Sequence, residues 1–178
     1  MLVMLIAGFW GFAEATFFFL IPDILLTYLA IRFGLRKALL ASIYAVCGAV
    51  FGGFLMYRWG VRSEEAALAF LDAIPAIGPE MFATVQGHLQ DHGVMGLFLG
   101  SANGIPYKIY AVNAPAQAVP FHTFLLMSFP ARMYRFLIVC FLAASFGYLS
   151  RSWPGHFRYG PLAVFWIVSY AIYFYHFL

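Results

Sequence analysis

Charged residues are scarce in this chain of 178 residues: Lys, Arg, Asp and Glu make up 10% of it, against about 25% in a soluble globular domain. Hydrophobic residues reach 64%, and the mean hydropathy is +0.87. This balance excludes a cytosolic enzyme, a disordered tail and a nucleic-acid-binding protein. An isoelectric point near 9.0 then indicates basic loops beside a membrane. The composition predicts an integral membrane protein.

Cysteine is rare as well, and no metal-binding pattern is present. Cys47 and Cys140 lie in apolar stretches without CxxC spacing, and we interpret them as two buried thiols. His88 and His92 stand four residues apart, but no third ligand is placed near them, so a solvated pair is favoured. We therefore expect no metal site.

Motifs of membrane enzymes are also absent. The chain has no HExxH motif and no serine beside a histidine base. Ser128 and Ser145 lie in stretches predicted to be helical, where hydroxyl groups commonly bond back to a carbonyl. We expect no enzymatic activity, no catalytic residue and no cofactor.

The first apolar stretch, residues 1–31, is interrupted near its middle. Its charged residues are Glu14 and Asp23, and Pro22 removes a backbone donor. A straight helix of about 30 residues would reach about 45 Å, beyond a hydrocarbon core of about 30 Å. We predict a re-entrant hairpin that enters and leaves the membrane on one side. Irregular backbone at that depth is tolerated only where it is buried or lines a cavity, so the break itself indicates a functional region.

Three stretches are predicted to cross the membrane fully: residues 38–57, 121–148 and 159–178. Along the first, small residues recur at i+4 spacing, which predicts close helix packing and offers a face that a homodimer would also use. These residues are Ala41, Ala45, Ala49 and Gly53. In the last, Tyr170, Tyr173 and Tyr175 resemble an interfacial aromatic belt.

Two further segments complete the predicted organisation. Residues 62–91 are polar and are expected to hold a short amphipathic helix on the membrane surface that stops at Pro75. Residues 93–118 are apolar but broken by glycine and proline around Lys108, which predicts a second re-entrant hairpin.

The short loops predict the orientation. If both hairpins enter and leave the membrane on one side without crossing it, five basic residues lie on the same side of the membrane: Arg32, Arg36, Lys37, Arg151 and Arg158. The other side keeps Arg58 and Arg62 among five acids, so the first group is placed in the cytoplasm. The predicted fold is an all-α inverted repeat of two re-entrant hairpins, each followed by a spanning helix, plus a C-terminal span. Secondary transporters use this plan and bind substrate where the breaks meet.

Ionisable residues inside apolar segments indicate a functional site. The acids Glu14 and Asp23 lie in the first half, and the bases Lys108, Arg132 and Arg135 lie in the second. In one interpretation the bases and Asn103 bind an anionic headgroup, while the acids take up and release protons. In the other, the charges form structural ion pairs that hold the hairpins together.

These residues resemble a known family. The run Phe12-Ala13-Glu14 through Ile21-Pro22-Asp23 is similar to the first hairpin of DedA-type membrane proteins, also called VTT-domain or SNARE-associated proteins. The family's next span is rich in glycine, and this chain is similar to it at Gly48, Gly52, Gly53, Tyr57 and Gly60. The stretch from Gly100 to Lys108, with Asn113-Ala114 and Phe121, resembles the family's second hairpin. The resemblance covers roughly residues 8–148. It implies that Glu14 and Asp23 correspond to essential acids and Lys108 to an essential base.

The chain departs from the family at two points. The second hairpin of the family usually carries Arg, then Pro, then Arg, whereas this chain has Asn103 and Lys108, as in a divergent subgroup with a Pro-Tyr-Lys signature. The chain also begins directly at the hairpin. Family members are associated with moving lipids across membranes, including undecaprenyl phosphate in bacteria and phospholipids in eukaryotes.

Together these observations predict a transporter of an anionic lipid, either undecaprenyl-phosphate-like or a phospholipid, with proton coupling left open. The alternatives are a small-solute or ion transporter that uses the same site, and a membrane assembly protein that transports nothing. The expected partner is a membrane lipid, joined by protons if transport is proton-coupled, with no nucleic acid. The expected location is a bacterial inner membrane, because no organelle-targeting segment is visible.

Overall fold

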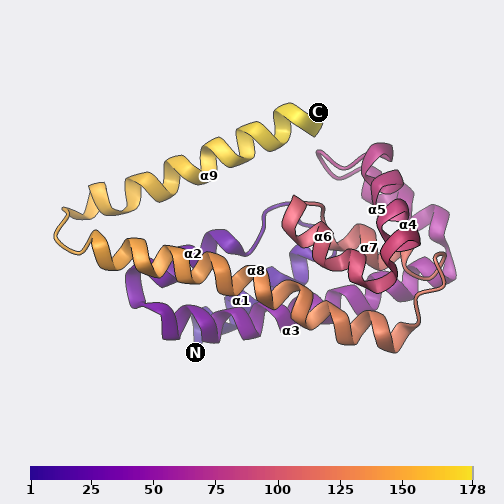
Figure 1. Ribbon diagram of the computed structural model, residues 1–178, viewed down its shortest axis with the longest axis horizontal. Coiled ribbons are helices and arrows are strands. Elements are labelled where there is room, and N and C mark those ends of the chain that lie inside the picture. Colours follow the sequence, from indigo (N-terminus) through magenta and orange to yellow (C-terminus); the bar gives the residue numbers. More distant parts are fainter. Residues whose placement is uncertain (178) are drawn as a thin grey trace.

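The computed structural model describes residues 1–177, with side chains for all of them except positions 155, 156 and 177, and every regular element in that range is a helix (Figure 1). The all-α prediction is confirmed for these residues. Among them, two helices are long and apolar enough to cross a membrane: α3 (Leu35–Arg62) and α8 (Phe121–Leu149). Both begin or end beyond the ranges expected from the sequence, α3 by several residues at each end.

The first half of the chain turns back on itself before α3. α1 (Leu2–Glu14) runs parallel to α3, because Gly11 lies against Ala45 and, further along, Gly52 lies against Ala15. Thirteen helical residues span about 20 Å. The chain then reverses through residues 15–22, and α2 (Asp23–Phe33) leads back to the start of α3.

The second broken segment approaches from the opposite end. After a short 3₁₀ turn (Gly93–Met95), α6 (Gly96–Asn103) leads to a break that contains Gly104 at φ 77°, and α7 (Tyr107–Asn113) leads away from it. α7 runs parallel to the second half of α3, since Gly53 lies against Tyr107 and Gly60 against Val112. The two breaks therefore lie near the middle of the molecule.

The polar connector forms two helices rather than one: α4 (Glu64–Asp72) and α5 (Pro79–His92). α4 ends three residues before Pro75, close to the predicted stop. The two histidines that were predicted to be solvated differ in their exposure. His92 is exposed, whereas His88 is half-buried and its Nδ1 lies 2.6 Å from the hydroxyl oxygen of Tyr110.

The small-residue face of α3 packs inside the molecule. Ala41, Ala45 and Ala49 are fully buried, and the neighbouring Gly48 touches the backbone of α1. The packing interpretation is confirmed for these residues, because α1 and the rest of the chain cover this face. Cys47 is exposed on the outer face of α3, so the buried-thiol interpretation holds only for Cys140.

α9 (Gly155–Phe177) lies apart from the other helices over much of its length (Figure 1). Near its start, Arg158 donates to the carbonyl oxygens of Ile31 (2.9 Å) and Gly147 (3.1 Å), at the ends of α2 and α8. The predicted loop position of Arg158 is therefore wrong. It is half-buried within the helix and joins three helix ends.

The tyrosines of α9 also differ from the predicted aromatic belt. The hydroxyl group of Tyr170 accepts a hydrogen bond from the backbone N–H of Ile21 (2.9 Å), and that of Tyr173 donates to the carbonyl of Ala76 (3.2 Å). Only Tyr175 of the three is exposed, at 92%. The belt prediction is wrong for Tyr170 and Tyr173, because their hydroxyl groups satisfy backbone groups of the first break and of the connection between α4 and α5.

Candidate functional site

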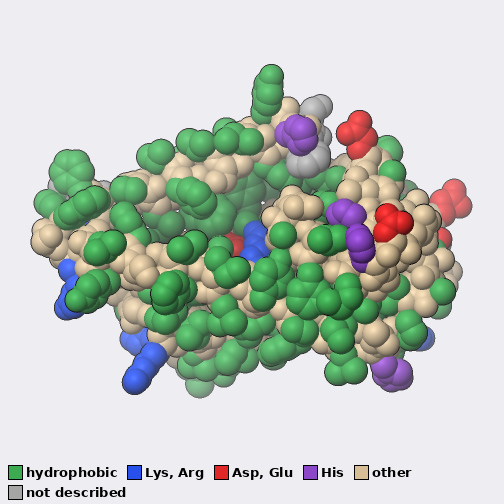
Figure 2. Space-filling model, in the orientation of Figure 1, with side chains coloured by type: hydrophobic (Ala, Val, Ile, Leu, Met, Phe, Trp, Pro, Cys, Tyr) green, Lys and Arg blue, Asp and Glu red, His purple; other side chains and the backbone are tan. Residues whose placement is uncertain are grey.

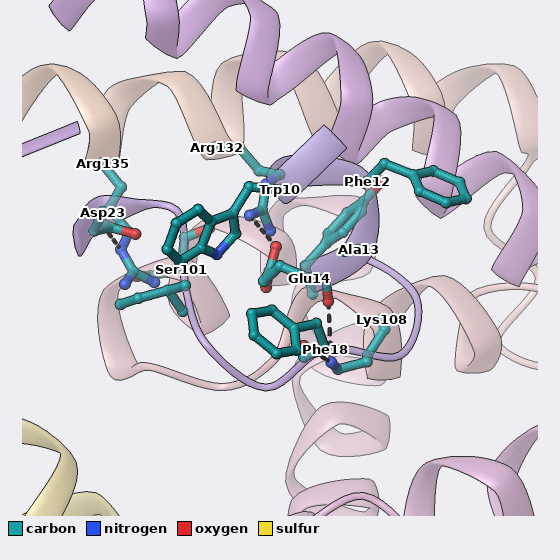
Figure 3. A network of polar contacts seen from close by, with 12 residues as sticks. Trp10, Phe12, Ala13, Glu14, Phe18, Asp23, Ser101, Lys108, Arg132 and Arg135 are labelled. Carbon is teal, nitrogen blue, oxygen red and sulfur yellow. Dashed lines mark hydrogen bonds and ion pairs between the residues drawn. The ribbon is translucent and has the colours of Figure 1, made fainter. Parts of the chain in front are cut away.

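The five ionisable residues singled out from the sequence lie in one cluster between the two breaks (Figure 3). Glu14, the last residue of α1, forms an ion pair with Arg132 of α8, and both side chains are buried, at 6% and 8% exposed. One helical turn further along α8, Nε of Arg135 lies 3.2 Å from Oδ1 of Asp23, the first residue of α2. The acids thus flank the first break, and α8 supplies a base to each.

The surroundings of Arg132 explain how a buried guanidinium is accommodated. Its Cζ lies 4.9 Å from the centre of the Tyr107 ring, a cation–π geometry that adds to the charge pairing with Glu14. The Tyr107 hydroxyl in turn donates to Oγ of Ser128 at 2.7 Å. Even so, Nε of Arg132 has no hydrogen-bond partner within the described part of the chain. Arg132 therefore keeps a buried donor that the protein itself does not satisfy.

Lys108 joins the two breaks directly. Its Nζ donates to the backbone carbonyls of Glu14 (3.0 Å) and Phe18 (2.6 Å), and the residue is only 1% exposed. The C-terminal end of a helix carries partial negative charge and unpaired carbonyls, which an ammonium group satisfies well. The first task of Lys108 is therefore to hold the end of α1 in place, while its remaining N–H stays available at the adjoining pocket.

Replacement of Lys108 by methionine should lower the stability of the folded protein by about 2–3 kcal/mol, because two charge-assisted hydrogen bonds are lost and two carbonyls are left unsatisfied. Lys108→Arg, which retains donors and charge, should lose less. Urea or SDS unfolding followed by circular dichroism would measure both variants. Equal loss in both would contradict the bonding role and indicate a purely steric one.

A cavity of about 230 Å³ adjoins the cluster. The charged residues in its lining are Glu14, Lys108, Arg132 and Arg135. Aromatic side chains from α7 and α9 form much of the remaining wall: Tyr107, Tyr110, Trp166, Tyr170 and Tyr173. The sequence interpretation missed this aromatic wall. A signal existed only for Tyr107, which directly precedes the lone lysine of the second break.

The charge balance of the cluster favours an anion. Three bases face two acids, which leaves a formal excess of one positive charge. Guanidinium groups bind phosphate through paired donors, and Arg135 is the more accessible of the two, with 26% of its side chain exposed. Oδ2 of Asp23 is buried without a hydrogen-bond partner among the described residues.

Asn103 lies apart from this arrangement. It is exposed at the C-terminal end of α6 and is outside the set of residues that line the cavity, although its neighbour Gly104 belongs to that set. The structure thus brings together five of the six predicted site residues and leaves Asn103 outside. Within the described residues, no group of three or more His, Cys, Asp or Glu side chains has the arrangement of a metal site.

Comparison with known proteins finds similar sequences of unassigned role. The chain is 27% identical over 142 residues to an uncharacterized protein of Haemophilus influenzae, a match that covers 78% of this chain and 72% of the relative. It is 29% identical over 143 residues to an uncharacterized protein of Histophilus somni, covering 78% and 73%. No family model matches the chain, and no solved structure matches it.

Proposed function

We propose that this protein is a membrane transporter that moves an anionic lipid across the bilayer, and that the cluster between the two breaks binds the phosphate of the headgroup. The observation that carries the proposal is a cavity with an excess positive charge at the meeting point of two interrupted helical segments. Two buried polar atoms of the cluster, Nε of Arg132 and Oδ2 of Asp23, lack partners in the described chain. A headgroup with acceptor and donor atoms would supply them.

The arrangement of the breaks supports a position of this cavity near the middle of a membrane. α3 and α8 are the apolar helices that would cross it, and the two broken segments reach the cavity from opposite ends along them. Both would then be re-entrant hairpins, with α9 as a third span. Irregular backbone at this depth lines a cavity and is satisfied by Lys108 and Tyr170, as membrane proteins require.

The charged residues at the two ends of the molecule support an orientation in an inner membrane with the α2–α3 and α8–α9 connections in the cytoplasm. Exposed Arg32, Arg36, Lys37 and Arg151 lie at that end, whereas the acids of α4 and α5 lie at the other. Apart from the red and blue atoms in the central hollow, Figure 2 shows charged side chains toward the two ends and hydrophobic ones over the face between them.

The ion pairs offer a way to couple transport to protons. When Glu14 or Asp23 is protonated, its arginine loses a counter-charge and becomes free to bind phosphate. Loss of the proton restores the ion pair and releases the anion. Proton binding and headgroup binding would then favour the same state, which links the lipid movement to a pH gradient.

A reconstitution assay tests the proposal. Liposomes that contain the purified protein would be loaded with fluorescent phospholipid or polyprenyl-phosphate analogues, and movement between leaflets would be followed with and without a pH gradient. The double variant Asp23→Asn/Arg135→Gln removes both charges while it keeps a neutral hydrogen bond between the same positions. We expect the movement to fall by at least about tenfold, which corresponds to about 1.4 kcal/mol of lost interaction.

Arg151→Gln is the matched control, because Arg151 is exposed on the connection between α8 and α9. It should transport like the wild type. Wild-type movement in the folded double variant would overturn the proposal and leave the charges as structural ion pairs. If soluble phosphate esters move while lipids do not, the small-solute transporter is the correct alternative.

A further inference from the structure

A second cavity, of about 670 Å³, lies between α2, α8 and α9. It shares Ser101, Gly104, Arg135 and Trp166 with the lining of the charged pocket, so the two are neighbours along one path. In Figure 2 the surface is hollowed between α9 and the rest of the molecule, with red and blue atoms visible inside the hollow and hydrophobic side chains around it. We call this second cavity the α8–α9 groove.

The α8–α9 groove is polar at one end and apolar along the rest. Asp23, Ser101 and Arg135 form the end beside the charged pocket. Away from that end the walls are built mainly from apolar side chains of α8 and α9: Ile138, Val139, Leu142, Leu162 and Phe165. This gradient from charge to hydrocarbon matches the shape of an amphiphile better than that of a small polar solute.

The groove is open to its surroundings on one side. Ile138 is 53% exposed, Leu142 61% and Phe165 58%, although all three line it. These residues lie on the helices that would stand in the hydrocarbon region, so the opening would face lipid tails. Water in such a groove would lack hydrogen-bond partners, and so would the backbone of an extended peptide.

We propose that the α8–α9 groove holds one hydrocarbon chain of a lipid whose phosphate lies at Arg135, and that the lipid enters sideways between α8 and α9. This inference rests on the proposed function, because the headgroup site fixes the polar end. Arg135 belongs to both linings and so marks the junction of headgroup and chain. The volume of the groove lies within the range of about 300–1,000 Å³ typical of ligand sites.

Trp166 provides a direct readout, because it lines both cavities and its Nε1 is fixed by a hydrogen bond to Thr27 at 3.1 Å. Bromine atoms on a bound lipid chain quench tryptophan fluorescence at short range. The protein in amphipol would be titrated with dibrominated phosphatidic acid and with diacylglycerol that carries the same chains but no phosphate. The quenching of Trp166 is obtained as the difference in quenching between the wild type and the variant Trp166→Phe.

We expect the phosphatidic acid to quench Trp166 at a concentration at least about tenfold lower than the diacylglycerol. Val139→Phe would narrow the groove and should weaken this quenching about tenfold, while thermal stabilisation of the protein by glycerol 3-phosphate should persist. Val168→Phe, the same substitution at a 49% exposed position of α9 outside both linings, is the control and should behave like the wild type.

Three other outcomes are informative in different ways. Equal quenching by both lipids would overturn the inference, since the groove would then be an unselective lipid contact. Stabilisation by glycerol 3-phosphate without phosphate-dependent quenching of Trp166 would also overturn it, but would leave the anion site in place. If neither phosphatidic acid nor glycerol 3-phosphate binds, the proposed function and the inference fail together.

Discussion

Replacing Glu14 with alanine is expected to lower the free energy of unfolding by about 3–5 kcal/mol, the range found when one partner of a buried ion pair is removed. Glu14 and Arg132 are both more than nine-tenths buried, and Nε of Arg132 already lacks a partner among the described residues. Without the carboxylate, the guanidinium would be a buried charge that has lost its ion-pair partner. SDS or urea unfolding of the purified protein, followed by far-ultraviolet circular dichroism, measures the change.

Two further variants separate the charge from the space that the side chain fills. Glu14→Gln/Arg132→Met replaces the pair by neutral groups of similar size and should recover most of the lost stability. Glu80→Ala removes an acid that is exposed on α5 and should change stability by no more than about 0.5 kcal/mol. If the double variant is as unstable as Glu14→Ala, lost packing and not an unpaired charge is the cause.

Gly48→Ala is the second change with a large expected effect, because a Cβ atom at this position would overlap the carbonyl oxygen of Gly8. The neighbour is backbone within a helix, so it cannot move aside as a flexible side chain does. α1 and α3 would have to separate along their whole contact. We expect a loss of at least about 3 kcal/mol, in line with overpacked cores, or no folded protein in detergent extracts. Size-exclusion chromatography after a temperature series provides the measurement.

Gly87→Ala is the matched control for this change. Gly87 is also helical, but a Cβ there meets nothing within 4 Å. Alanine has the higher helix propensity, so this variant should be unchanged or more stable by about 0.5–1 kcal/mol. Comparable loss in both variants would mean that the flexibility of glycine, and not the close approach of α1 to α3, matters at position 48.

The sequence predicted where the helices break but not which side chains would meet. Pro22 and the residues around Lys108 indicate breaks by local chemistry, since proline lacks a donor and glycine tolerates positive φ. The partners of Glu14 and Asp23 depend on the register between α1, α2 and α8, for which the chain carries no local signal. Both arginines were equally plausible for either acid.

The interpretation of α9 failed for a related reason. Tyrosines near the end of an apolar helix normally lie at the membrane interface, and nothing in residues 159–178 distinguishes Tyr170 from that pattern. Its inward position follows from an unpaired N–H at Ile21, created by a break about 150 residues earlier in the chain. The aromatic part of the site therefore became visible only in three dimensions.

The bonds of the first break also set the order in which the protein can be completed during synthesis. The carbonyls of Glu14 and Phe18 are satisfied by Lys108, Asp23 is paired by Arg135, and the N–H of Ile21 is satisfied by Tyr170. All of these partners emerge from the ribosome long after α1 and α2. The amino-terminal half must therefore wait in an unfinished state until the last helix is made, and a fragment that ends at α3 should be cleared by proteases.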